Sequence, residues 1–129
     1  MTEATILVVE DNERNRKLVR DVLQFAGFDV VAAETAERGI DLALQCPPDL
    51  ILMDLQLPGM DGVEAMHQLR TASRTSTVPI VAVTAQAMKD DRRLALAAGF
   101  DGYIEKPISV PALPEQVRSY LQPHEEAAT

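Results

Sequence analysis

Short apolar runs alternate with longer amphipathic segments along the whole chain. The apolar runs predict five buried strands, at residues 5–9, 28–33, 49–53, 79–83 and 101–104. Each segment between them repeats apolar residues every three or four positions, which predicts a helix with one buried stripe. Because strand and helix alternate five times with short connections, we expect an α/β fold with a parallel sheet and helices on both faces.

Residues at the segment boundaries predict where several helices begin and end. Thr35 is an N-cap candidate for the second helix. Gly27 and Gly99 follow the first and fourth helices, where glycine adopts the left-handed backbone most easily. The fifth helix is expected over residues 110–121, with its two prolines confined to around the first turn.

The size and charge of the chain limit its organisation and its partners. At 129 residues we expect one domain over residues 1–122 and a flexible polar tail at 123–129. The 20 acidic and 12 basic residues give a formal charge of -8, which argues against a nucleic acid or a membrane surface as partner. No apolar run approaches the roughly 18 residues that span a bilayer, and no signal peptide is evident, so a cytoplasmic protein is expected.

Two further features carry no predicted chemistry of their own. The basic cluster RNRK at 14–17 is expected to do no more than solvate a helix face. Cys46 is the only cysteine and cannot form an internal disulfide, so we expect a small buried apolar group at the end of a helix.

Polar residues follow four of the five predicted strands. Glu10 and Asp11 follow the first strand, Asp54 the third and Thr84 the fourth, and Lys106 lies just after the fifth. The carboxyl ends of parallel strands lie at one edge of the sheet, so these residues should meet in a single crevice. Three carboxylates repel one another unless a cation lies between them, and Mg²⁺ prefers such oxygen ligands. An aspartate can attack phosphorus, so the pattern predicts phosphoryl transfer.

Four motifs make the chain resemble a response-regulator receiver domain of two-component signalling. They are VVEDNERN at 8–15, LILMDLQLPGMDG at 50–62, VAVTAQAMKDD at 81–91 and AAGFDGYIEKPI at 97–108. The resemblance covers essentially the whole chain and implies a flavodoxin-like receiver fold with strand order 2-1-3-4-5. The phrases VTAQAMKDD and YIEKPISV further resemble single-domain receivers of the DivK type. Receivers fused to hybrid histidine kinases use similar phrases, so a domain excised from a larger protein is the alternative.

The resemblance also implies a phosphoacceptor and a set of Mg²⁺ ligands. By similarity, Asp54 accepts the phosphoryl group from a phosphohistidine of a histidine kinase or histidine phosphotransfer protein. Asp11 and Asp54 correspond to direct metal ligands, Glu10 to a ligand through water, and the backbone carbonyl of Gln56 to a further ligand. Such a protein is not an enzyme with a separate substrate, but it assists its own phosphotransfer and dephosphorylation.

The remaining implied roles concern the phosphate and the output of the signal. Thr84 and Lys106 correspond to phosphate contacts, and Tyr103 to an aromatic switch residue. A cis peptide bond is expected between Lys106 and Pro107. The implied surface for a downstream protein comprises the fourth helix, the fifth strand and the fifth helix.

Two other functions fit this pattern less well. An FMN electron carrier of flavodoxin type shares the sheet order, but Glu10 and Asp11 would repel the flavin phosphate after the first strand. An aspartate-nucleophile phosphohydrolase typically has a second acid two residues after the nucleophile. That position is Gln56 here, and no cap segment is present to hold a small substrate.

Overall fold

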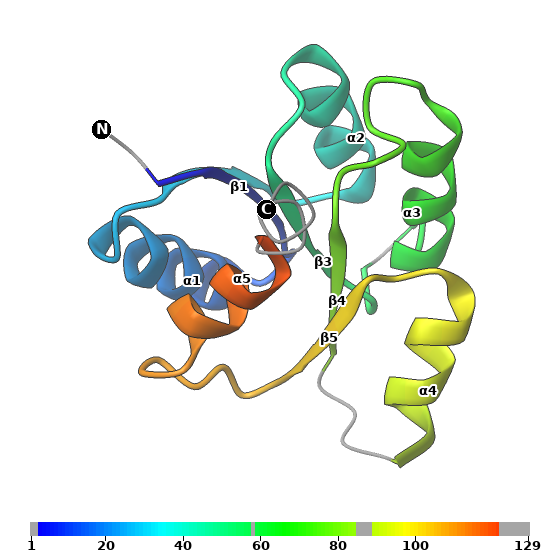
Figure 1. Ribbon diagram of the computed structural model, residues 1–129. Helices are drawn as coiled ribbons and strands as arrows, with labels where there is room; N and C mark the ends of the chain where they lie inside the picture. Colours follow the sequence, from blue (N-terminus) through cyan, green and yellow to red (C-terminus); the bar gives the residue numbers. More distant parts are fainter. Residues whose placement is uncertain (1–2, 58, 85–88, 122–129) are drawn as a thin grey trace, which may run out of the picture.

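The computed structural model describes residues 3–57, 59–84 and 89–121. Its five strands form one parallel sheet in the order β2-β1-β3-β4-β5, which confirms the expected topology (Figure 1). The strands are β1 (Thr5–Val9), β2 (Asp29–Ala33), β3 (Leu50–Asp54), β4 (Ile80–Thr84) and β5 (Gly102–Glu105).

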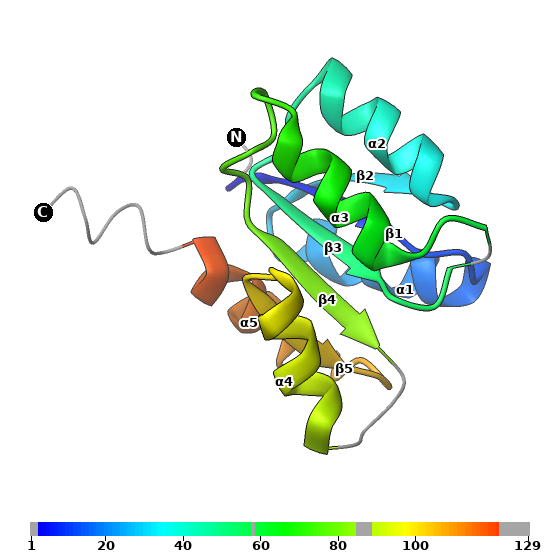
Figure 2. The same cartoon turned by 90° about the vertical axis from the view of Figure 1, so that its right-hand side faces the viewer.

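Five helices cover the two faces of this sheet. They are α1 (Glu13–Phe25), α2 (Ala36–Gln45), α3 (Gly62–Thr71), α4 (Lys89–Ala98) and α5 (Leu113–Leu121). Helices α1 and α5 pack on one face, and α2, α3 and α4 on the other (Figure 2). No helix in the described ranges is both long enough and apolar enough to cross a membrane.

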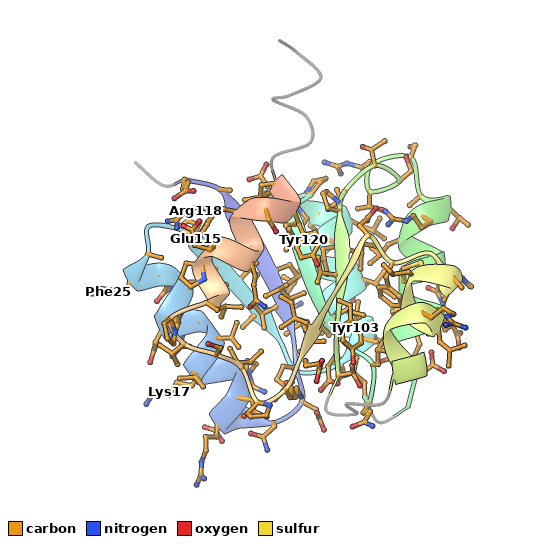
Figure 3. The ribbon with its side chains drawn as sticks, turned by 60° about the horizontal axis from the view of Figure 1, so that its bottom comes forward. Lys17, Phe25, Tyr103, Glu115, Arg118 and Tyr120 are labelled. Carbon is orange, nitrogen blue, oxygen red and sulfur yellow. The ribbon has the colours of Figure 1, made fainter. Side chains whose placement is uncertain are left out.

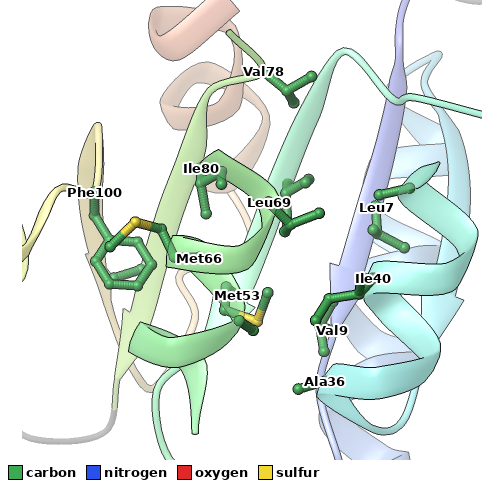
Figure 4. Close-up of a cluster of buried hydrophobic side chains, with 14 of the residues drawn as sticks. Leu7, Val9, Ala36, Ile40, Met53, Met66, Leu69, Val78, Ile80 and Phe100 are labelled. Atoms are coloured by element: carbon green, nitrogen blue, oxygen red, sulfur yellow. The ribbon is translucent and has the colours of Figure 1, made fainter. Parts of the chain in front are cut away.

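The alternation of side chains along each strand supplies both hydrophobic cores. In β1, Ile6 and Val8 face α1 and α5, whereas Leu7 and Val9 face α2 and α3. Figure 4 shows the second of these cores, in which Leu7 and Val9 lie with residues of β3, β4, α2 and α3. Because all the central strands are buried on both faces, only their ends are available to carry polar chemistry.

Most of the predicted boundaries agree with the structure. The hydroxyl of Thr35 accepts a hydrogen bond from the Arg38 N–H at 3.1 Å, which confirms the predicted N-cap. Gly27 and Gly99 have φ angles of 106° and 123°, which confirms the left-handed residues after α1 and α4.

Two of the predictions about helix ends are wrong. Helix α5 begins at Leu113 rather than at residue 110, and Pro111 lies in the turn before it. The N–H groups of Ala112 and Leu113 both donate to the Ser109 carbonyl, and Pro111 has no N–H to donate, so residues 110–112 form a turn that leads into the helix. Cys46 is exposed rather than buried, because it caps the end of α2 where the chain leaves the core.

An arginine joins the last described helix to the start of the chain. The Nε and Nη2 atoms of Arg118 donate to the two carboxylate oxygens of Glu3 at 2.7 and 3.1 Å, and Nη2 also donates to the Ala26 carbonyl. The guanidinium lies 5.3 Å from the centroid of the Phe28 ring. Figure 3 shows Arg118 on α5 beside the end of α1.

Candidate functional site

The carboxyl ends of four strands bring the predicted polar residues to one edge of the sheet. Glu10 follows β1, Asp54 ends β3, Thr84 ends β4 and Lys106 follows β5. The Lys106 ammonium lies 2.7 Å from Glu10 Oε1 and 3.0 Å from Asp54 Oδ2. Asp54 and Thr84 are each 2 % exposed, and Glu10 is 4 % exposed. The predicted convergence of Glu10, Asp54 and Lys106 is therefore confirmed.

Three carboxylates gather at this edge. Glu10, Asp11 and Asp54 each offer an oxygen, and the three oxygens lie within 4.8 Å of one another. Glu10 and Asp54 are buried, whereas Asp11 is exposed at the mouth of the cluster. Hard divalent cations prefer oxygen ligands and are bound in proteins by a small number of carboxylates. The donor set fits a Mg²⁺ ion that solvent can reach.

The backbone after β3 holds the central carboxylate in place. Asp54 Oδ1 accepts a hydrogen bond from the N–H of Gln56 at 2.9 Å, and its other oxygen contacts Lys106. Gln56 itself is exposed. Each carboxylate oxygen of Asp54 therefore has a hydrogen-bond partner among the described residues.

Burial and charge act in opposite directions on the ionisable groups of the site. Burial raises the pKa of Glu10, and the nearby Asp54 also raises it, against the lowering effects of Lys106 and the Asn12 N–H. Burial alone would lower the pKa of Lys106, but its hydrogen bonds to Glu10 and Asp54 outweigh this effect and raise that pKa. The pKa values of Glu10 and Lys106 are therefore both raised. This is consistent, because two buried carboxylates hold the proton on one ammonium, whereas that single ammonium cannot neutralise both carboxylates. Lys106 stays charged, and the site favours additional positive charge.

Two residues beside the acidic pair hold it in place through hydrogen bonds. Asn12 caps α1 by accepting from the Asn15 N–H, and its own N–H donates to Glu10 Oε2 at 3.1 Å. Arg16 Nη1 donates to the backbone carbonyls of Glu10 and Asp11 at 3.0 and 3.4 Å. The expectation that the basic cluster only solvates a helix face is wrong for Arg16. The sequence could have indicated this role, because Arg16 lies one turn after the N-cap and helical side chains lean toward the N-terminus of the helix.

The segment after Lys106 and the predicted switch residue lie next to the site. The Lys106–Pro107 peptide bond is cis, which confirms that prediction. Tyr103 lies in the middle of β5, is partly buried and packs against the core beneath α4 (Figure 3). Residues 85–88 of the motif that follows Thr84 lie outside the described residues.

Comparisons with known proteins agree with this geometry. The family model of the response regulator receiver domain matches residues 6–118. The polar-differentiation response regulator DivK of Brucella ovis is 42% identical over 117 residues, which cover 91% of this chain and 95% of that protein.

Solved structures of response regulators and receiver domains have the same fold as this chain. A putative response regulator from Chloroflexus aurantiacus superposes with a TM-score of 0.86 at 30% identity, over 92% of this chain and 97% of that one. The receiver domain of a sensor histidine kinase from Pseudomonas aeruginosa, with a magnesium ion coordinated in its active site cleft, superposes with a TM-score of 0.84 at 32% identity and the same coverage. From the family match, the relatives and the fold together, the chain belongs to the response regulator receiver domain family.

Proposed function

We propose that this receiver domain is a phosphorylation-dependent switch that accepts a phosphoryl group from a phosphohistidine onto Asp54. One observation carries the proposal. The Asp54 carboxylate is buried at the end of β3, 3.0 Å from the Lys106 ammonium and clustered with two further carboxylates. The donor would be a histidine kinase or a histidine phosphotransfer protein, as family membership suggests. The proposal applies whether the domain acts alone or joined to other domains.

The proposed transfer is a single displacement at phosphorus. A carboxylate oxygen of Asp54 attacks the phosphorus atom, and the new O–P bond forms as the N–P bond to the donor histidine breaks. The histidine nitrogen keeps the electron pair and is later protonated from water. Lys106, which the site keeps charged, stabilises negative charge on the phosphoryl oxygens, and the Thr84 hydroxyl donates to one of them.

A divalent cation would complete this site. We assign Asp11 and Asp54 as direct ligands of Mg²⁺, the Gln56 carbonyl as a further ligand, and Glu10 as a ligand through water. The bound ion would offset charge on the transferring group. The three clustered carboxylates support this assignment.

The proposed function is tested by phosphotransfer from an autophosphorylated histidine kinase in the presence of Mg²⁺. We expect an acyl phosphate that peptide mapping by mass spectrometry places on Asp54, and no transfer when EDTA removes the metal. A modification on any other residue, or equal transfer with EDTA, would contradict the proposal.

The metal assignment predicts a change in thermal stability. Mg²⁺ should raise the melting temperature of the wild-type protein, because a ligand at 100 times its Kd stabilises the native state by about 2.7 kcal/mol. Asp11→Ala should lose most of this increase, whereas Asp41→Ala, at an exposed position on α2, should keep it. The comparison is made by differential scanning calorimetry with and without Mg²⁺. An equal increase in Asp11→Ala and the wild type would refute the assignment of Asp11.

The output of the switch is proposed to pass from Thr84 to Tyr103. The two residues lie on the neighbouring strands β4 and β5, where Thr84 is paired to Glu105 and Tyr103 to Ala82, two residues before Thr84. Movement of Thr84 toward the phosphate would let the Tyr103 ring turn inward and change the surface of α4, β5 and α5. Leu94 and Leu96 of α4 are exposed on the described part of this helix. An exposed apolar surface of this kind supports binding of a downstream protein there.

This route predicts that two substitutions separate phosphorylation from output. Thr84→Ala and Tyr103→Ala should still accept phosphate at Asp54 but should bind a phosphorylation-dependent partner about tenfold more weakly. A hydrogen bond to a charged group contributes about 1.5–3 kcal/mol, and 1.4 kcal/mol corresponds to a factor of ten. Titration calorimetry at equal phosphorylation measures the difference. If both variants bind the partner like the wild type, the route is wrong.

A further inference from the structure

An open groove follows the outer edge of β5. It has a volume of about 300 Å³ and is lined by Tyr103, Glu105, Pro107, Ser109 and Gln116. Two of these residues belong to the strand, two to the connection after it, and Gln116 to α5. The groove is therefore part of the surface that we propose for the downstream protein.

The backbone at this edge is already hydrogen-bonded within the chain. β5 is the last strand of the sheet, so one side of it has no neighbouring strand. The Tyr103 N–H donates to the Tyr120 hydroxyl at 3.3 Å, and this hydroxyl donates to the Tyr103 carbonyl at 3.5 Å. A Cβ atom at Gly102 would lie 2.2 Å from the Tyr120 ring, so only glycine leaves room for this arrangement. An incoming strand could not pair with β5 at Tyr103, and a ligand must be recognised by side chains.

The side chains of the groove offer hydrogen-bond acceptors and negative charge. Glu105 is exposed and forms no ion pair with any described side chain. The ammonium of the next residue, Lys106, is turned away to Glu10 and Asp54. Gln116 Oε1 is buried and has no hydrogen-bond partner among the described residues. A buried acceptor without a donor is unfavourable, so a rotation of the Gln116 side chain that brings this oxygen to a donor in the groove removes this cost.

We propose that the groove binds an arginine side chain of the downstream protein, an inference that rests on the proposed function for the location of the partner. A guanidinium has five N–H donors in a fixed planar arrangement, so it can serve the Glu105 carboxylate and the Gln116 oxygen together. The formal charge of -8 on the whole chain favours the approach of a basic partner.

The test is an NMR titration of the unphosphorylated protein with Nα-acetyl-arginine methylamide. The matched probe is Nα-acetyl-citrulline methylamide, which has nearly the same shape and no charge. We expect the arginine probe to shift the backbone amides of Tyr103, Glu105 and Ser109 and the side-chain amide of Gln116. The citrulline probe should bind about fivefold more weakly or not at all.

Substitutions identify the groups responsible. Glu105→Gln and Gln116→Ala should each weaken binding of the arginine probe about fivefold, whereas Asp41→Asn, which removes one charge from α2, should leave it unchanged. Amide spectra without probe establish that each variant is folded. Equal binding of the two probes, absence of shifts at the groove, or equal weakening by Asp41→Asn and Glu105→Gln would overturn the proposal.

The same protein sample is also tested for phosphotransfer to Asp54. Phosphorylation at Asp54 without arginine binding would refute the groove alone. If the arginine probe binds but the kinase does not phosphorylate Asp54, the proposed phosphoacceptor is refuted and the groove is supported. The two proposals therefore fail separately.

Discussion

Asp54→Asn is expected to abolish phosphorylation and to leave the fold no less stable than that of the wild type. The amide has nearly the same shape as the carboxylate but is not a nucleophile toward phosphorus. In the wild-type protein, one Lys106 ammonium contacts two buried carboxylates. The substitution leaves a balanced pair between Lys106 and Glu10 and removes the repulsion within the acidic cluster.

The stability of the variant should also depend less on pH. The pKa of Glu10 is raised by burial and, in part, by Asp54. A carboxyl group with a raised pKa in the folded state contributes stability that is present below about pH 4.5, its unfolded value, and is lost as the pH rises through the folded pKa. Asp54→Asn should lower the folded-state pKa of Glu10, because the nearby carboxylate is gone. The free energy of unfolding should then fall over a narrower pH range.

Phosphotransfer assays with Mg²⁺ measure the first effect, and thermal unfolding between pH 4 and pH 8 without divalent metal measures the second. Asp41→Asn serves as the control and should match the wild type in phosphorylation and in pH dependence. Phosphorylation of Asp54→Asn at position 54, or a marked fall in its melting temperature at neutral pH, would contradict the prediction.

Lys106→Met should destabilise the metal-free protein by about 3 kcal/mol at neutral pH. Removing one partner of a buried ion pair typically costs about 3–5 kcal/mol because the other charge remains buried. Here two carboxylates would lose their only cation among the described residues, and we expect the lower end of the range because Lys106 retains 16 % side-chain exposure. Burial raises the pKa of Glu10, so protonation of Glu10 in acid should recover part of the loss, and Mg²⁺ should recover part of it at neutral pH.

Urea unfolding at pH 7 and at pH 4 measures this difference. Lys17→Met is the matched control, because Lys17 is an exposed residue of α1 (Figure 3) and its replacement should change stability little. The prediction is wrong if the two variants lose the same stability at pH 7, or if the loss in Lys106→Met is unchanged at pH 4.

The sheet and the location of the site could be predicted because both follow from short-range patterns. An apolar run that ends in Asp54 or Thr84 marks a buried strand and its carboxyl end. In a parallel sheet, those ends lie at one edge whatever the details of packing. The contact of Lys106 with Glu10 and Asp54 is a consequence of this rule.

Other features depend on contacts between distant residues and have no local signal. The hydrogen bonds of the Tyr120 hydroxyl to Tyr103 require α5 to lie over the end of the sheet. The exposure of Cys46 depends on where α2 ends relative to the core. The contacts of Arg16 depend on the direction of its side chain along α1, which apolar periodicity does not describe.

The contact between Arg118 and Glu3 has a consequence for how such a domain can be combined with others. It brings residues 115 positions apart together at the amino edge of the sheet, whereas Asp54 and Lys106 lie at the carboxyl edge. A reporter or a regulatory module fused next to either Glu3 or Arg118 would therefore stand away from the surface that a phosphate donor approaches. The same proximity favours circular permutation, because a short linker from the end of α5 to Glu3 would lie away from the site.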